Sequence, residues 1–310
     1  MEISKIEFGY SPEKEEVILR TIIARHGPKL TAEGEKNDLA DYFDDHVIAG
    51  FENMDINKAK DGLIRVNTSD VKRAVDTANI HNEQLKKTGH RRKEYIKTNE
   101  NLAVPLQPIE DAKEERFAQD LDTIMKMQSE IKPTIKDQVE KELSSLDEKE
   151  REAELRNRID MQVLSEMFED ENREDKNKKF KTSYKELADI FAKRYARLAR
   201  HKNLIKKMKN DGGKQPEDEP YMQIDVTHSF PVSAFLKKYL VFDDGGKSIN
   251  MESGEFFEKT GGIIRESGSF NMDYIVDDSD ELKIAVKGDF SGSQPFSGEV
   301  DMRALAELNK

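Results

Sequence analysis

Three short motifs of this sequence carry arginine or histidine at the point where an apolar run ends. Each run is short and rich in β-branched residues, which predicts a buried strand. If these strands are parallel, their carboxyl ends meet at one edge of a sheet, where open α/β sheets bind their ligands. In chain order the motifs are Arg25-His26-Gly27 after residues 17–24, Ser69 to Ala78 (with Arg73) after residues 63–68, and Val226-Thr227-His228-Ser229 at the end of residues 222–227.

The motifs would bring two arginines and two histidines into one pocket, and this set suits phosphate. An arginine presents a planar fork that binds phosphoryl oxygens in bidentate fashion. A neutral imidazole can attack phosphorus, and a second histidine can donate a hydrogen bond to the charge that develops on the transferring group. Gly27 lets the backbone approach closely, and helix N-termini after these loops would add positive dipole ends. The residues therefore predict phosphoryl-transfer chemistry.

In this order, and each after a strand, the motifs resemble those of the histidine phosphatase superfamily, which also contains the cofactor-dependent phosphoglycerate mutases. The resemblance implies that His26 is the phosphoryl acceptor. It implies that Arg25 and Arg73 clamp the phosphate, with Gly27 beside them, and that His228 completes the pocket. It implies neither a metal ion nor an organic cofactor.

The resemblance covers about residues 17–110 and 180–245, and it departs from the family pattern in two places. The mutases carry a serine and an asparagine after the Arg-His-Gly motif, whereas residues 28–31 here are Pro-Lys-Leu-Thr, which favours hydrolysis. The acid-phosphatase branch has an acidic residue just after the second histidine. Here His228 is followed by Ser229-Phe230, so the chain is more similar to the mutase-like branch.

That branch places a carboxylate proton donor after the third strand in chain order, which is expected here over residues 94–98. Glu100, Glu110 and Asp111 lie in this region, and Glu110 is our preferred candidate. In the expected mechanism His26 attacks a phosphate monoester while this acid protonates the leaving oxygen, and water then hydrolyses the phosphohistidine. Some members of the family lack such a donor and act on phosphohistidine, so this alternative stays open.

The composition argues against several other classes of function. The 310 residues carry a net charge of −12, whereas nucleic-acid binders normally show a basic face. There is no cysteine, so disulfides and thiolate metal sites are excluded, and we expect no metal site. The N-terminal residues lack the apolar core of a signal peptide, and no apolar run approaches the roughly 20 residues that span a bilayer. We expect a cytoplasmic protein that binds neither nucleic acid nor membrane.

The alternation of strands and helices predicts an α/β, three-layer fold with a central, mostly parallel sheet. The second strand is followed by a helix for which Ser69 or Asp70 is the expected N-cap. Residues 245–303 combine glycines with short apolar runs, which predicts a β-rich C-terminal extension of antiparallel strands at a sheet edge.

Between these parts, residues 112–209 are dense in Lys and Glu and show apolar residues at helical spacing. Pro133 interrupts this pattern, and Ser183 opens a further helix with Glu186 in a capping box. We expect a helical insertion over residues 112–180, with residues 1–111 and 181–310 forming the histidine-phosphatase-like α/β domain. The insertion would pack on itself, on the sheet domain, or on another copy of the chain as a homo-oligomer.

The sequence therefore predicts a metal-independent phosphatase that acts on a small phosphorylated substrate or a phosphoprotein through a phosphohistidine on His26. Two alternatives are a phosphomutase of the same superfamily and a catalytically inactive scaffold or interaction protein that retains the fold. The substitutions after the Arg-His-Gly motif count against the mutase, and the four retained Arg and His residues count against the scaffold.

Overall fold

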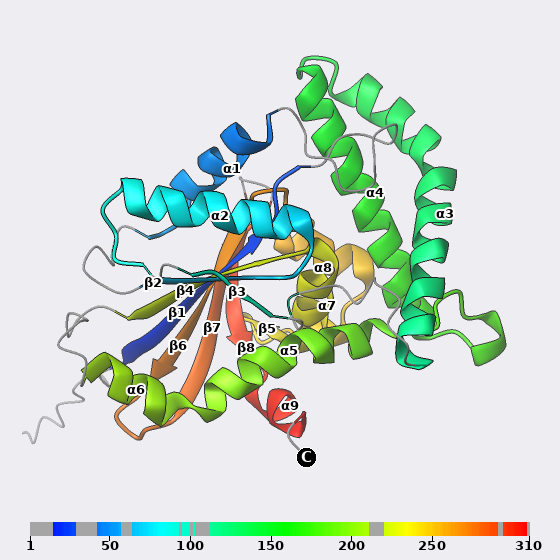
Figure 1. Ribbon diagram of the computed structural model, residues 1–310. Helices are drawn as coiled ribbons and strands as arrows, with labels where there is room; N and C mark the ends of the chain where they lie inside the picture. Colours follow the sequence, from blue (N-terminus) through cyan, green and yellow to red (C-terminus); the bar gives the residue numbers. More distant parts are fainter. Residues whose placement is uncertain are drawn as a thin grey trace, which may run out of the picture.

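The computed structural model of the chain describes residues 15–28, 42–56, 64–92, 95–99, 102, 112–210, 220–290 and 294–308. Its strands form one sheet of eight, with the order β3-β2-β4-β1-β6-β7-β8-β5 (Figure 1). The strands are β1 (Glu16–Arg25), β2 (Ile64–Thr68), β3 (Lys97–Thr98), β4 (Tyr221–Thr227), β5 (Leu240–Phe242), β6 (Ser269–Val276), β7 (Leu282–Asp289) and β8 (Pro295–Val300).

Helices of very different length surround the sheet. The α-helices are α1 (Phe43–Glu52), α2 (Lys72–Lys87), α3 (Ala112–Glu142), α4 (Glu148–Asp170), α5 (Tyr184–Arg200), α6 (Lys202–Asn210), α7 (Ser229–Tyr239), α8 (Ser253–Thr260) and α9 (Met302–Glu307). Two short 3-10 helices lie at Asp175–Asn177 and Ser248–Asn250. No helix within the described ranges is long and apolar enough to cross a membrane.

The sheet is parallel in one half and antiparallel in the other. β1, β2, β3 and β4 pair in parallel, and this half carries the three motifs. The pairings of β1 with β6, and of β6, β7, β8 and β5 among themselves, are antiparallel. The α/β class is confirmed, but the expectation of a mostly parallel sheet holds only for the first half. Short connections join β6 to β7 and β7 to β8, and such links can connect only antiparallel strands.

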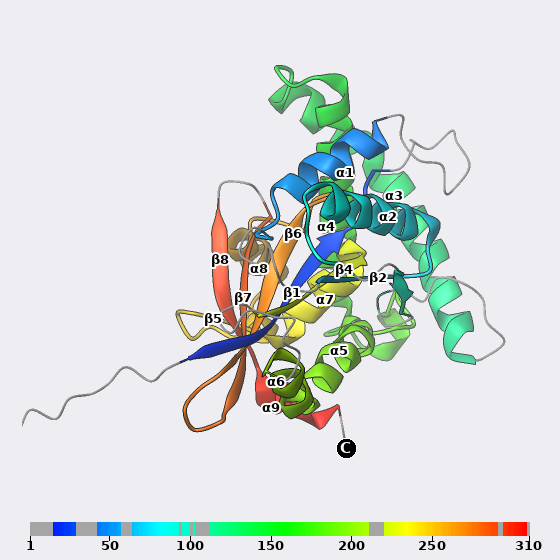
Figure 2. The same ribbon diagram turned by 60° about the vertical axis from the view of Figure 1, so that its left-hand side comes forward.

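The two faces of the sheet are covered by different helices, as the three-layer prediction requires. On one face, α1 and α2 pack against alternate residues of β1, β2 and β4, such as Ile22, Val66 and Ile224. On the other face, α5 and α7 pack against Ile23 and against the antiparallel half. Figure 2 shows the sheet between these two layers. Alternation along each strand sends neighbouring side chains to opposite layers.

Residues 112–180 contain α3 and α4, two long helices that lie side by side to one side of the sheet (Figure 1). The C-terminal part of α4 packs into the main core through Leu164, Met167 and Phe168. The insertion therefore contacts the sheet domain directly. Its contribution to a homo-oligomer and the division into domains remain predictions.

Three local expectations can be compared with the structure. Ser183 is the N-cap of α5, and its side chain accepts from the backbone of Lys185 and Glu186. The expected N-cap of α2 is wrong: Val71 takes that position, because the Ser69 hydroxyl contacts His228 instead. Pro133, which interrupts the apolar pattern, lies inside α3, and the helix continues through it. A proline removes one backbone hydrogen bond, and the bonds on either side keep this long helix continuous.

Candidate active site

His26 follows β1 directly and is held at the carboxyl edge of the parallel strands. Its backbone N–H donates to the carbonyl of Thr227 (3.0 Å), which ties it to the end of β4. Its ring atom Nδ1 lies 2.7 Å from the carbonyl oxygen of Gly27. Because a carbonyl can only accept, Nδ1 must carry the hydrogen, and the neutral ring then has its lone pair on Nε2. The backbone thus fixes the tautomer that a nucleophilic histidine needs.

Gly27 joins this loop to α2. Its N–H donates to the hydroxyl of Thr77 (2.9 Å), and that hydroxyl donates to the carbonyl of Arg73 (2.7 Å). A Cβ atom on Gly27 would lie 2.6 Å from side-chain atoms of both Phe43 and Val47. Only glycine therefore fits between α1 and α2 at this point.

His228 is the N-cap residue of α7 and lies beside His26. The two ring centroids are 4.8 Å apart, with an angle of 61° between the ring planes. Nε2 of His228 is 3.1 Å from the hydroxyl oxygen of Ser69, the residue that follows β2. The backbone N–H of Ser69 in turn donates to Val226 in β4. The ends of β1, β2 and β4 are therefore linked to one another through the site.

Both histidines are neutral because their surroundings disfavour a positive charge. His26 is 4% exposed and His228 is 7% exposed. Burial, with Arg73, His228 and Arg25 adding to it, lowers the pKa of His26 well below its ordinary value. Burial and the same two arginines lower the pKa of His228 to about 3. A phosphate dianion in this pocket would offset the repulsion that the arginines create.

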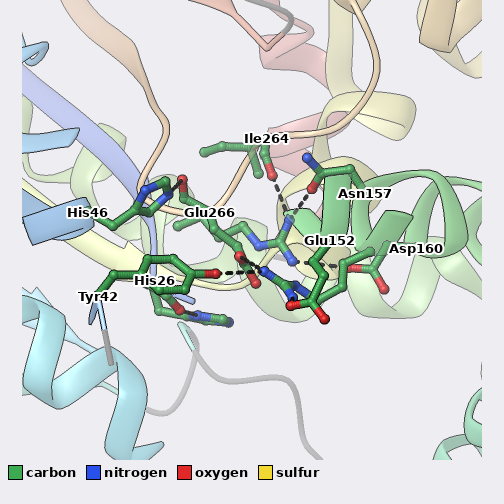
Figure 3. A network of polar contacts seen from close by, with 11 residues as sticks. His26, Tyr42, His46, Glu152, Asn157, Asp160, Ile264 and Glu266 are labelled. Atoms are coloured by element: carbon green, nitrogen blue, oxygen red, sulfur yellow. Dashed lines mark hydrogen bonds and ion pairs between the residues drawn. The ribbon is translucent and has the colours of Figure 1, made fainter. Parts of the chain in front are cut away.

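Arg25 does not point into open space, because helix α4 binds it (Figure 3). Its Nη2 donates to Asp160 (3.0 Å), and its Nη1 donates to Asn157 (3.2 Å) and to the carbonyl of Ile264 (3.0 Å). Its Nε is buried and has no hydrogen-bond partner. Arg25 is thus adjacent to the histidines, but a role as phosphate clamp, which remains a prediction, would require some of these contacts to be exchanged.

Arg73 lies at the start of α2 and acts electrostatically on both histidines. Its pKa is lowered, first by burial and then by Arg25, while Glu266 and Asp160 partly offset this. Its Nε is buried without a hydrogen-bond partner. The two arginines predicted from the motifs thus lie close enough to act electrostatically on both predicted histidines, and the catalytic roles of the four residues stay predictions.

A second group of residues at this pocket was not predicted from the sequence. Arg156 of α4 donates to Glu266 (3.0 Å) and to the hydroxyl of Tyr42 (3.4 Å), and its Nε and Nη1 have no hydrogen-bond partner. His46 contacts the carbonyl oxygen of Glu266 (3.2 Å; Figure 3). Glu266 raises the pKa of Arg73 and Arg156 lowers it, so both lie near that residue.

For the contribution of α4 to the site, the sequence offers one signal, which is the spacing of its polar residues. Positions 156, 157 and 160 share one helical face, but Lys and Glu surround them in a segment whose composition indicates a solvated helix.

The candidates for the proton donor, Glu100, Glu110 and Asp111, lie outside the described residues. Their role stays a prediction. Among the residues that the structure does describe, no cluster of three or more His, Asp or Glu side chains could hold a metal ion. The described carboxylates nearest to the predicted arginines are Asp160, which binds Arg25, and Glu266, which binds Arg156.

No protein-family model matches this chain, and no curated protein is significantly similar to it. Among solved structures, it is similar to the mycobacterial glucosyl-3-phosphoglycerate phosphatase Rv2419c, with 11% identity over 88% of this chain and 98% of that chain and a TM-score of 0.43. It is also similar to a phosphoglycerate mutase from Bacillus anthracis, with 15% identity over 96% and 98% of the two chains and a TM-score of 0.37. A third similar structure is YhfR of Bacillus stearothermophilus, with 12% identity over 88% of this chain and 98% of that chain and a TM-score of 0.39.

These are phosphoglycerate mutase-like histidine phosphatase structures, the superfamily that the three motifs resemble.

Proposed function

We propose that this protein is a metal-independent phosphatase of the histidine phosphatase superfamily, with His26 as the nucleophile. The observation that carries the proposal is the contact between Nδ1 of His26 and the carbonyl of Gly27. It leaves the lone pair on Nε2, in a ring whose lowered pKa keeps it neutral, next to two arginines and a second neutral histidine. A buried neutral imidazole beside guanidinium groups suits attack on a phosphoryl group.

In the first step Nε2 of His26 forms a bond to phosphorus while the bond from phosphorus to the leaving oxygen breaks. A carboxylic acid, with Glu110 preferred over Glu100 and Asp111, gives its proton to that oxygen. In the second step the same carboxylate takes a proton from water, whose oxygen attacks phosphorus, and the bond to Nε2 breaks. Arg73, Arg25 and His228 stabilise the charge on the phosphoryl oxygens in both steps.

The proposed substrate is a small phosphorylated molecule. Both histidines are almost completely buried, so a phosphoryl group must enter a narrow site to reach them. Arg156 adds a third guanidinium from α4, with Glu266 beside it. A flexible phosphorylated side chain of a protein could also enter, whereas a phosphate held rigidly on a folded surface could not.

The first test is hydrolysis of para-nitrophenyl phosphate in the presence of EDTA, with the wild type and His26→Ala compared side by side. We expect activity that survives the chelator and that falls by at least about a thousandfold in the variant, because the covalent route is lost. Near-wild-type activity in the folded variant would contradict the proposal. Radiolabel from the substrate should also be trapped on wild-type protein, and not on the variant, by an alkaline quench with detergent, because a phosphohistidine is labile in acid and stable in alkali.

A further inference from the structure

A polar patch lies on a sheet face where an apolar layer is expected. On β2, Ile64 and Val66 point to α1 and α2, while Arg65 and Asn67 point to the opposite face. On the neighbouring strands, Gln223 of β4 is in register with Arg65, and Lys97 of β3 is in register with Asn67. Sequences that place charged residues at core-facing positions lose stability, so such exceptions tend to mark functional sites.

The C-terminal half of α5 lies over this patch and leaves a cavity of about 170 Å³ between helix and strands. The helix lines this cavity with one face, which includes its C-cap and consists of positions 194, 197, 198 and 201. The side chains at this cavity include Arg65, Lys97, Arg194, Arg197 and His201, and none of the described carboxylates lines it.

Among the described residues, Asp225 is the carboxylate that binds a cavity residue, and its oxygens already accept several hydrogen bonds. Asp225 is fully buried and accepts hydrogen bonds from Arg194 (2.6 and 2.7 Å), Asn67 (2.7 Å) and Tyr195 (3.3 Å). It therefore neutralises Arg194 and has no remaining capacity for another cation.

The other three cations at the cavity are Arg65, Lys97 and Arg197. Within the part of the chain that the structure describes, Arg65, Lys97 and Arg197 form no ion pair. Nε of Arg65 is buried without a hydrogen-bond partner. Like charges that converge without a counter-ion destabilise a fold, and a chain with a net charge of −12 has many carboxylates that could have been placed here.

We propose that this cavity, lined by Arg65, Lys97 and Arg197, is a binding site for a small tetrahedral oxyanion such as orthophosphate, separate from the pocket around His26. None of the cavity residues belongs to that pocket. The volume is below the roughly 300–1,000 Å³ of sites for drug-sized ligands, so a free oxyanion fits better than a nucleotide or a sugar phosphate. Arginine and lysine supply the charge-assisted hydrogen bonds that such an anion needs.

The experiment is equilibrium dialysis with radiolabelled orthophosphate on the full chain. We expect two phosphates per wild-type chain, one at each site. Arg65→Met combined with Arg197→Met should weaken the cavity site at least tenfold, because hydrogen bonds to charged groups are lost. Arg200→Met is the matched control for the single variant Arg197→Met, since each removes one charge from an exposed position near the end of α5 and position 200 does not line the cavity. Excess sulfate should compete at the cavity.

Arg73→Met separates the two sites. It should weaken the pocket around His26 and leave the cavity phosphate bound, so the cavity is tested even if the proposed phosphatase activity fails. The single variant Arg197→Met, at an exposed position, covers the case in which the double variant does not fold. Phosphate that binds the folded double variant with wild-type affinity and stoichiometry, or all binding lost in Arg73→Met, would overturn the inference.

Discussion

At the scale of single residues, the chemistry depends on which histidine nitrogen carries a proton. The Gly27 carbonyl holds the hydrogen on Nδ1 of His26, and burial together with Arg73 keeps the ring from gaining a second one. The same surroundings keep His228 neutral, with a pKa of about 3. A nucleophile prepared in this way needs no general base for its own attack, because its lone pair is already available.

This arrangement predicts how the two rings behave on titration. In the protein without ligand, the imidazole NMR signals of His26 and His228 should not move between about pH 8 and pH 5.5, a range in which an ordinary histidine gains its proton. Bound orthophosphate should raise both pKa values, because an anion offsets the repulsion from the arginines. The spectra of His26→Ala and His228→Ala assign the signals. A midpoint near the ordinary histidine value in the ligand-free protein would contradict the description of the site.

At the scale of elements, the parallel strands and their loops could be predicted because local signals define them. β1, β2 and β4 are β-branched runs, and the residues after them form the site. The part played by α4 could not be predicted. Asn157 and Asp160 reach Arg25 only through the packing of the insertion on the sheet domain, and the charge pattern of a helix does not tell which of its polar residues are covered.

Glu266 was missed for a related reason. It lies in the loop before β6, and only the antiparallel pairing of β6 with β1 brings this loop to His26. The sequence predicts antiparallel strands in this region but not their partner, since pairing between distant strands leaves no local signal.

The position of α4 predicts an effect on ligand affinity. Asp160 holds Arg25 and carries a negative charge in a pocket that is proposed to bind phosphate. Asp160→Asn should lower the inhibition constant of orthophosphate roughly tenfold, because a like charge is removed. It should also lower the free energy of unfolding of the ligand-free protein by roughly 1–3 kcal/mol, because Arg25 keeps only neutral partners.

Glu148→Gln is a suitable control for this prediction, since it makes the same change of charge at an exposed position of the same helix. Inhibition assays and urea unfolding measure the two effects. If Asp160→Asn weakens phosphate binding while Glu148→Gln has no effect, then Asp160 serves to position Arg25 and not to compete with the ligand.

At the scale of the whole molecule, buried histidines couple stability to pH. The pKa of His81 is lowered to about 3 by burial, and both of its ring nitrogens lack hydrogen-bond partners. It packs against Phe51, away from any proposed chemistry. With His26 and His228, it belongs to a set of three rings that stay neutral in the folded chain. In the unfolded chain all three would gain a proton near pH 6.5.

Because the unfolded state binds the extra protons, the free energy of unfolding should fall as pH falls from about 6.5 towards 5. Each ring contributes up to about 1.4 kcal/mol per pH unit, and the carboxylates add their own effect only at lower pH. His81→Leu should raise stability by about 1–2 kcal/mol at pH 7.5, because an unsatisfied buried ring is removed. It should also reduce the pH slope by about one third, since one of three comparable rings is gone.

Urea unfolding at several pH values, with wild type and variant side by side, measures both quantities. An unchanged slope in His81→Leu would mean that this histidine is protonated in the folded protein or that the unfolded chain does not titrate as expected.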